Sequence, residues 1–144
     1  MKKIKIIFII LGVMLVIFVV IQVIPVSRTN PPVLAEPNWD SPQTRDLFYQ
    51  ACGDCHSNET AWPWYSYISP VSWLISNDVK RGRAIFNVSE TGSIAPGQGN
   101  EAAEVIQEGE MPPTTYLLMH ALARLSPEEK AALIDGLMKT FQGK

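Results

Sequence analysis

The sequence has 144 residues and a formal net charge of −2 at pH 7, a length that suggests one compact domain with an additional segment. Three of its twelve basic residues precede residue 6, so residues 25–144 carry the other nine against all fourteen acidic residues, a balance of −5. This charge argues against nucleic-acid binding, because no basic face stands out to neutralise phosphates. Two cysteines also exclude a disulfide-dense scaffold.

Residues 6–24, IIFIILGVMLVIFVVIQVI, are almost entirely apolar and long enough to cross a bilayer core as a helix. The lysines before this run predict a cytoplasmic N-terminus, with the remainder of the chain on the other side. A cleaved signal peptide is the alternative, but the run is longer than the usual apolar region and no small-residue cleavage site follows it. We therefore expect residues 1–24 to be an uncleaved membrane anchor.

Residues 25–38 contain four prolines, which favour extended chain and predict a semi-rigid linker. A domain over residues 39–144 follows. Ser41-Pro42 is a typical helix start, with Leu47, Phe48 and Ala51 on one face of the helix behind it. Ser69-Pro70 repeats this signal before an amphipathic pattern formed by Val71, Leu74, Ile75 and Val79.

Residues 87–100 are rich in Gly, Ser, Asn and Pro and predict a loop. Asn100 is expected to cap a helix that Gly109 ends, and a short helix is expected over residues 115–123. Ser126 begins a capping box, and behind it one face of a final helix carries Leu133, Ile134, Leu137, Met138 and Phe141. No segment alternates as a strand does, so we expect an all-α fold with long loops.

The stretch Cys52-Gly53-Asp54-Cys55-His56 holds both cysteines and one of the two histidines. A thioredoxin-type thiol pair would need a strand before it, and a zinc site would need four ligands, of which His120 would have to be one. A plain disulfide leaves His56 without a role. The fourth alternative is the attachment of one c-type haem: two thiols add to the two vinyl groups of a porphyrin, and the next histidine binds the iron. The export segment and the preceding helix favour this alternative.

A six-coordinate haem iron needs a second axial ligand, usually Met or His. Met111 is the first candidate, because it lies in a proline-stiffened loop 55 residues after His56. His120 is the alternative ligand, and an open site is also considered. Met119 and Met138 are expected to be core residues.

Long runs of the chain resemble a bacterial family of membrane-anchored haem-binding domains. They are "IPVSRTNPPV", "CGDCHSNETAWPWYSYISPVSW", "DVKRGR" and "EGEMPPTTYLLMHALARLS". The order of helix, CxxCH, Met-Pro loop and C-terminal helix is similar to that of class I c-type cytochromes. The resemblance implies a haem c domain with Cys52, Cys55 and His56 as the attachment set. It says little about the distal ligand or the partner, and the loop at residues 87–100 is short and glycine-rich for the family.

Aromatic residues after the motif are candidates for packing against the haem or binding its propionates, namely Trp62, Trp64, Tyr65 and Tyr67. Arg81, with Lys80 and Arg83, is a candidate for pairing with propionates or is a solvated helix end. Glu101, Glu104, Glu108 and Glu110 form an acidic stretch before Met111. It is expected to be a solvated face, with docking of a basic redox partner as a weaker hypothesis.

These features predict a membrane-tethered mono-haem cytochrome that carries single electrons and is not an enzyme. We expect it in the bacterial inner membrane with its haem domain in the periplasm. Its partners would be the bilayer, through residues 6–24, and a redox protein or membrane respiratory complex. The alternative is a haem-based sensor or accessory subunit with an open or weak sixth ligand. A peroxidase, which also needs an open iron, is a third alternative.

Overall fold

The computed structural model describes residues 2–142, and all the regular structure in that range is helical. The only pairing of extended backbone there is an isolated bridge between Ala35 and Glu90. The predicted all-α class is therefore confirmed. The chain divides into two compact units, each described by itself. Unit 1 comprises the residues up to Thr29 together with Trp62–Asp78, and unit 2 comprises Asn30–Ala61 together with the residues from Val79 onward.

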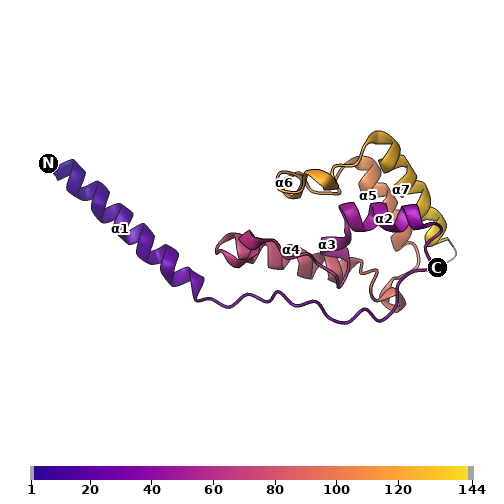
Figure 1. Ribbon diagram of the computed structural model, residues 1–144, viewed down its shortest axis with the longest axis horizontal. Coiled ribbons are helices and arrows are strands. Elements are labelled where there is room, and N and C mark those ends of the chain that lie inside the picture. The colour runs from indigo at the N-terminus through magenta and orange to yellow at the C-terminus, as the bar shows by residue number, and fades with distance from the viewer. Residues whose placement is uncertain (1, 143–144) are drawn as a thin grey trace. The chain divides into compact units, whose positions relative to one another are not determined.

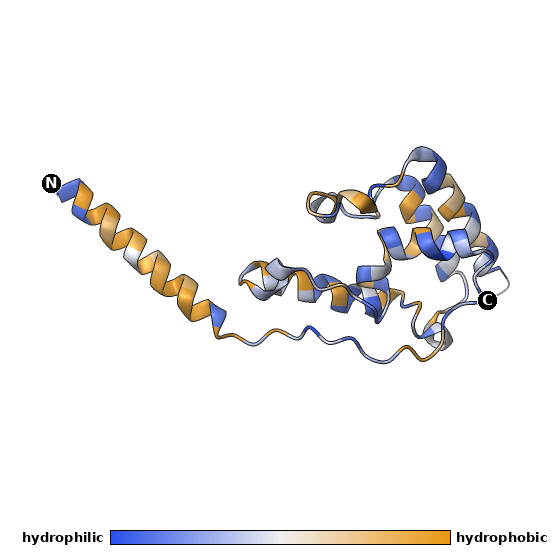
Figure 2. Cartoon of the chain, viewed as in Figure 1, coloured by the Kyte–Doolittle hydropathy of each residue, from blue (hydrophilic) through white to orange (hydrophobic). Residues whose placement is uncertain are grey.

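Unit 1 contains α1 (Lys2–Gln22), the short 3-10 helix η1 (Trp64–Tyr67) and the first part of α4 (Val71–Ile85). Figure 2 shows that α1 is apolar over nearly all its length, with hydrophilic residues only near its two ends. It buries no side chain, and it is the one helix within residues 2–142 whose length and composition would allow it to cross a membrane. The other segment of unit 1 contacts the C-terminal end of α1, where the Gln22 side chain forms two hydrogen bonds with the backbone of Ser69.

Unit 2 contains the remaining elements. They are α2 (Pro42–Ala51), α3 (Gly53–His56), the rest of α4, η2 (Thr91–Ser93), α5 (Gln98–Glu108), α6 (Thr114–Leu117), η3 (Ala121–Ala123) and α7 (Pro127–Thr140). Helices α5 and α7 lie side by side, and α2 packs against α7 (Figure 1). Their apolar faces form one core, made of Leu47, Phe48, Phe86, Val88, Ile94, Ala103, Ile106, Leu133, Leu137 and Phe141.

The predicted helix boundaries of unit 2 are largely confirmed. The Ser41 side chain accepts the Thr44 N–H at the start of α2, and Ser126 forms a reciprocal capping box with Glu129 at the start of α7. Gly109 ends α5 in the left-handed conformation that glycine adopts without steric cost.

Other details of the prediction were wrong. Helix α5 begins at Gln98, two residues before the predicted cap Asn100, because Gly97 with its positive φ already provides the turn. The helix expected over residues 115–123 is two short helices, α6 and η3. Met119 and Met138 are exposed rather than part of the core. On α7 the buried face is centred on Leu133, Gly136 and Leu137, and Met138 points away from it.

Candidate functional site

The motif forms one tight turn directly after α2. The Cys52 N–H donates to the Phe48 carbonyl and ends α2, and the N–H groups of Cys55 and His56 both donate to the Cys52 carbonyl. The two thiols and the imidazole therefore come from a single turn, α3. Both cysteines are free thiols and are half-buried.

A backbone contact orients the His56 ring. Its Nδ1 lies 2.9 Å from the Phe86 carbonyl oxygen, which can only accept, so Nδ1 carries the proton and Nε2 keeps its lone pair. Burial lowers the pKa of His56, and hydrogen bonds to the Phe86 and Gly82 backbone only partly offset this effect. The ring is therefore neutral at pH 7. A neutral imidazole whose Nδ1–H is held by a carbonyl is typical of a histidine that binds a metal through Nε2.

The C-terminal half of α4 lies directly against the motif. A Cβ atom on Gly82 would overlap the Cys55 carbonyl, so this approach requires glycine. Beyond α4, the Val88 N–H donates to the His56 carbonyl at 2.9 Å. The chain after the motif is held by Arg83, which donates to the Ser57 carbonyl (2.8 Å), Thr60 Oγ1 (2.8 Å) and Asn30 Oδ1 (2.9 Å).

A buried polar network also joins the chain after the motif to the chain after α4. Asn87 Nδ2 donates to Asn58 Oδ1 at 3.0 Å, and the Asn58 N–H donates to Ser89 Oγ at 2.8 Å. The Ser89 N–H completes the network by donating to Asn87 Oδ1. All three residues are buried. Connected buried networks of this kind favour one rigid arrangement.

Asp54, inside the motif, is bound to the segment that follows Met111. The Tyr116 hydroxyl, from α6, donates to Asp54 Oδ2 at 2.7 Å, and the Ala61 N–H donates to Asp54 Oδ1 at 2.8 Å. Burial and the bond to Asp54 raise the pKa of Tyr116, so the hydroxyl stays protonated and donating. The His120 ring stacks on Tyr116 with its centroid 3.9 Å away, and its Nδ1 donates to the Tyr116 carbonyl.

Met111 is half-buried and is fixed at the end of α5. The N–H groups of Glu110 and Met111 both donate to the Val105 carbonyl. Met111 and Cys52 line the same cavity of about 170 Å³, with Leu117 and Leu133 among its apolar walls and Arg124 and Lys130 as its basic members. Ordinary ligand pockets measure about 300–1,000 Å³, so this cavity alone does not enclose a whole porphyrin. His120 is not among the described residues that line it.

The structure argues against two alternatives for Cys52 and Cys55, a redox thiol pair and a zinc site. Burial, and secondarily the nearby Cys55, raises the pKa of the Cys52 thiol to about 12. Redox-active thiol pairs instead have a lowered pKa. Within residues 2–142, no three His, Cys, Asp or Glu side chains are grouped so that they could hold a metal ion, so the zinc alternative has no ligand set.

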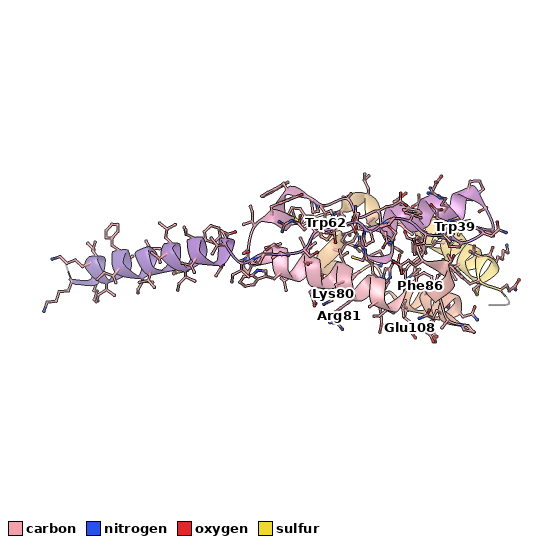
Figure 3. The ribbon with its side chains drawn as sticks, turned by 90° about the horizontal axis from the view of Figure 1, so that it is seen from below. Trp39, Trp62, Lys80, Arg81, Phe86 and Glu108 are labelled. Carbon is pink, nitrogen blue, oxygen red and sulfur yellow. The ribbon has the colours of Figure 1, made fainter. Side chains whose placement is uncertain are left out.

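The other predicted site residues lie elsewhere. Trp62, Trp64 and Tyr65 belong to unit 1, and their packing role stays a prediction. Arg81 and Lys80 are exposed on α4 and project from its outer side (Figure 3), and the propionate role of Arg81 likewise stays a prediction.

Several residues near the motif were not predicted from the sequence. They are Phe86, Gly82, Tyr116, Arg124 and Lys130. Arg124 could have been found only by supposing that the Met-Pro loop folds back beside Cys52.

Comparison with known proteins identifies the family. A family model described as a haem-binding domain matches residues 16–139. The chain belongs to the haem-binding domain family. A relative among curated proteins is the cytochrome c peroxidase Ccp of Escherichia coli (strain K12), 28% identical over 97 residues. The match covers 62% of this chain and 21% of the relative, so this chain corresponds to about a fifth of that protein. No solved structure matches the chain.

The residues of this haem-binding domain fit the group that the family binds. One turn presents two thiols beside a neutral imidazole whose Nε2 is the available nitrogen, and a thioether side chain shares a cavity with the first thiol. Thiols, imidazole and thioether are the protein groups through which c-type haem is held.

Proposed function

We propose that the protein is a membrane-anchored mono-haem c-type cytochrome that transfers single electrons. The observation that carries this proposal is the orientation of His56. This residue lies in the same turn as Cys52 and Cys55, and its Nδ1–H is held by the carbonyl of the distant Phe86. Bound haem supplies a one-electron Fe(III)/Fe(II) couple, whose potential depends on the axial ligands and on burial. The protein's part is to hold the iron between fixed ligands, so that little reorganises when an electron arrives or leaves.

Each residue has a distinct role in this proposal. The thiols of Cys52 and Cys55 each add across one vinyl C=C bond, so that an S–C bond forms and the thiol hydrogen passes to the neighbouring carbon. His56 binds the iron through Nε2. Met111 is the proposed distal ligand, supported by the cavity that it shares with Cys52, and His120 is the alternative. Arg124 and Lys130 supply positive charge for the propionates.

Intact-mass measurement of the chain made together with a haem-attachment system tests covalent binding. The expected mass increase is that of one haem, and Cys52→Ser with Cys55→Ser should abolish it. The variant His56→Ala should still gain the mass but lose its low-spin spectrum, because attachment needs only the thiols. A chain whose mass does not increase, or whose haem is extracted by acidic organic solvent, would contradict type c attachment.

The ferric absorption spectrum tests the distal ligand. A methionine ligand gives a weak thioether-to-iron band at the red end of the visible range, and Met111→Ala should abolish it. Met119→Ala is the matched control, because Met119 is exposed and lies eight positions further along the chain. Loss of the low-spin spectrum in His120→Ala, with Met111→Ala unchanged, would assign the ligand to His120.

A function with an open iron, such as peroxide reduction or gas sensing, is the second candidate. The observation that favours it is the likeness to the cytochrome c peroxidase Ccp. The same spectra decide between the candidates: a high-spin ferric spectrum with ready carbon monoxide binding supports the open site. A low-spin spectrum that resists carbon monoxide supports the electron carrier.

The proposed setting is the bacterial inner membrane, with α1 as a single-pass anchor, the N-terminus in the cytoplasm and the haem domain in the periplasm. A basic redox protein or membrane respiratory complex is the proposed partner. Glu101, Glu104 and Glu108 are exposed at a spacing that places them on one side of α5, and Figure 3 shows Glu108 on the outside of the unit. Electron transfer to such a partner should slow with rising salt, and Glu104→Lys with Glu108→Lys should remove that dependence. Glu128→Lys on α7 is the control.

A further inference from the structure

Unit 1 carries an unusual group of exposed apolar side chains on residues 62–78. Trp64, Tyr67 and Leu74 are 71%, 60% and 65% exposed, and Ile68 and Val71 are exposed as well. The sequence pattern predicts an amphipathic helix here, yet of that pattern only Val79, at its far end, is deeply buried. Single exposed apolar residues are ordinary on protein surfaces, but a group of large ones indicates a binding surface.

The same segment is fastened to the C-terminal end of α1. Gln22 Nε2 donates to the Ser69 carbonyl at 3.1 Å, and the Ser69 N–H donates to Gln22 Oε1 at 2.9 Å. Ser76 Oγ donates to the Ser27 carbonyl at 2.8 Å. The exposed apolar group therefore begins where the proposed membrane-spanning helix ends.

The chemistry of the segment fits the boundary between lipid and water. Asp78 is its only charged residue, and its exposed aromatic side chains, Trp64 and Tyr67, are the types enriched at membrane interfaces. The Arg28 guanidinium lies 4.4 Å from the Tyr67 ring centroid and donates to the Ser66 carbonyl, so a cation is placed beside the rings. An amphipathic helix with one apolar side lies in the interface plane rather than across it.

We propose that residues 62–78 form a second membrane contact, which lies in the headgroup region of the bilayer and buries Trp64, Tyr67, Ile68, Val71 and Leu74 among the lipids. The argument is the continuity of this surface with the end of α1, and it rests on the proposed anchoring of α1 in a bilayer. Unit 1 is then an anchor of two parts, a spanning helix and a surface helix. The lipid, rather than a protein partner, is the proposed occupant.

Photolabelling from the membrane tests the contact. The full holoprotein is placed in phosphatidylcholine nanodiscs that contain a phosphatidylcholine with a diazirine near the glycerol end of one acyl chain. After illumination, peptides with lipid adducts are identified by mass spectrometry. Adducts are expected in α1 and in residues 62–78.

Val71→Ser with Leu74→Ser should reduce the adducts in residues 62–78 severalfold while those in α1 persist. The matched control is Ile85→Ser, an exposed apolar residue on the same helix outside unit 1, which should change neither.

The outcomes separate this inference from the proposed function. Adducts in α1 but none in residues 62–78 would overturn the second contact and leave that surface to a protein partner, with the anchor intact. Adducts in neither segment would overturn both the anchor and the contact. Adducts in residues 62–78 that Val71→Ser with Leu74→Ser does not reduce would overturn the assignment of these side chains. The haem spectrum, recorded on the same samples, reports on the cytochrome proposal independently.

Discussion

Gly82 lies where α4 comes closest to the motif, against the carbonyl of Cys55. The obstacle to a side chain there is backbone rather than a flexible group, so neither partner can easily give way. The chain directly after α4 holds the His56 ring through the Phe86 carbonyl and the His56 carbonyl through the Val88 N–H. The position of the imidazole therefore depends on a residue that contributes no side chain.

Gly82→Ala should destabilise the protein by about 1–3 kcal/mol, the usual cost of inserting a methyl group into a packed contact. Denaturant unfolding of the holoprotein measures this change. Gly92→Ala is the control, since a Cβ atom there meets nothing within 4 Å, and it should stay within about 0.5 kcal/mol of the parent. Equal stability of the two variants would show that α4 does not press on the motif.

Glu36 is held in ionised form by the side chains around it. Arg45 donates to both carboxylate oxygens at 2.9 Å, and Trp39 Nε1 donates to one of them at 3.1 Å. The bond from Arg45 is the main reason that the pKa of Glu36 falls from 4.5 to about 2. The carboxylate therefore joins the segment before α2 to α2 itself.

The lowered pKa of Glu36 determines how stability changes with acid. A depressed folded-state pKa stabilises the fold above the unfolded value, so this contribution is complete above about pH 4.5 and is lost as the pH falls towards 2. Glu36→Gln should lower stability at pH 7 by about 1 kcal/mol, because the partly exposed pair is screened by solvent. Its stability should also fall less steeply between pH 4.5 and 2. Thermal melting across this range is the measurement, with the exposed Glu128→Gln as control; parallel pH profiles for parent and Glu36→Gln would contradict the prediction.

The role of a single residue can be predicted from the sequence when the residues that define it are its neighbours in the chain. The spacing of Cys52, Cys55 and His56 is a property of one turn, so the motif and its local geometry could be predicted. The carbonyl of Phe86 lies thirty residues away, and every residue has such a group, so no residue type marks it. The same holds for Gly82, because a glycine required by close packing looks like any other glycine in the sequence.

Helix α6 is short, and the bond from Tyr116 to Asp54 fixes it to α3. Its four residues cannot form a stable helix alone, because so short a helix gains little for the cost of nucleation. The Met111–His120 segment therefore owes its position to Tyr116 and to the end of α5. The stacked His120 ring moves with the same side chain.

Tyr116→Phe should cost about 1.5–3 kcal/mol, the usual worth of a hydrogen bond to a charged group, and should loosen α6. Amide hydrogen exchange should be faster over residues 112–120 while α7 is unaffected. Tyr49→Phe is the matched control, because the Tyr49 hydroxyl also bonds carboxylates, Glu59 at 2.8 Å and Glu36 at 3.3 Å, but contacts neither α3 nor α6 through them. It should therefore leave exchange in residues 112–120 unchanged. Unchanged exchange in α6 would mean that the Asp54 bond does not hold this segment.

Helix ends illustrate what is predictable at the scale of elements. Ser41, Ser126 and Gly109 act on their own helices within a few residues, so their signals could be interpreted directly. The start of α5 was misplaced because both Gly97 and Asn100 can begin a helix, and the sequence does not decide between them. The two short helices around residue 120 depend on distant contacts, α6 on the Tyr116–Asp54 bond to α3 and η3 on contacts with α2. The local sequence does not show these contacts, so it predicts one helix there.

The division into two units follows from contacts between segments that are far apart in the chain. Residues 62–78 follow the motif in sequence but pack with the end of α1, through bonds such as that from Gln22 to Ser69. Glutamine at the end of an apolar run gives no hint of its partner 47 residues later. Contacts of this kind leave no signal in the sequence, so the linker over residues 25–38 and the domain over residues 39–144 stay predictions.

The apolar surface of α1 has no partner in the rest of the described chain, since none of its side chains is buried. Val13→Arg with Ile17→Arg should prevent insertion, because each charge near the centre of a spanning helix costs about 2.5–3.5 kcal/mol. The variant should leave the membrane pellet in an alkaline wash, in which the parent stays. Ser27→Arg, which lies beyond the end of α1, is the control and should stay in the pellet. Retention of the α1 variant would show that another segment suffices for membrane attachment.

Under the proposed thioether attachment, the burial of Cys52 has a chemical consequence for the chain that does not yet carry haem. Because burial raises the pKa of the Cys52 thiol to about 12, this thiol is almost entirely protonated at pH 7. Only the thiolate attacks disulfides and oxidants at an appreciable rate. A folded chain without haem would thus be slow to oxidise at this sulfur, and equally slow to accept the vinyl group. If haem is attached as proposed, attachment should therefore be fastest on a chain that is still folding, before Cys52 is buried.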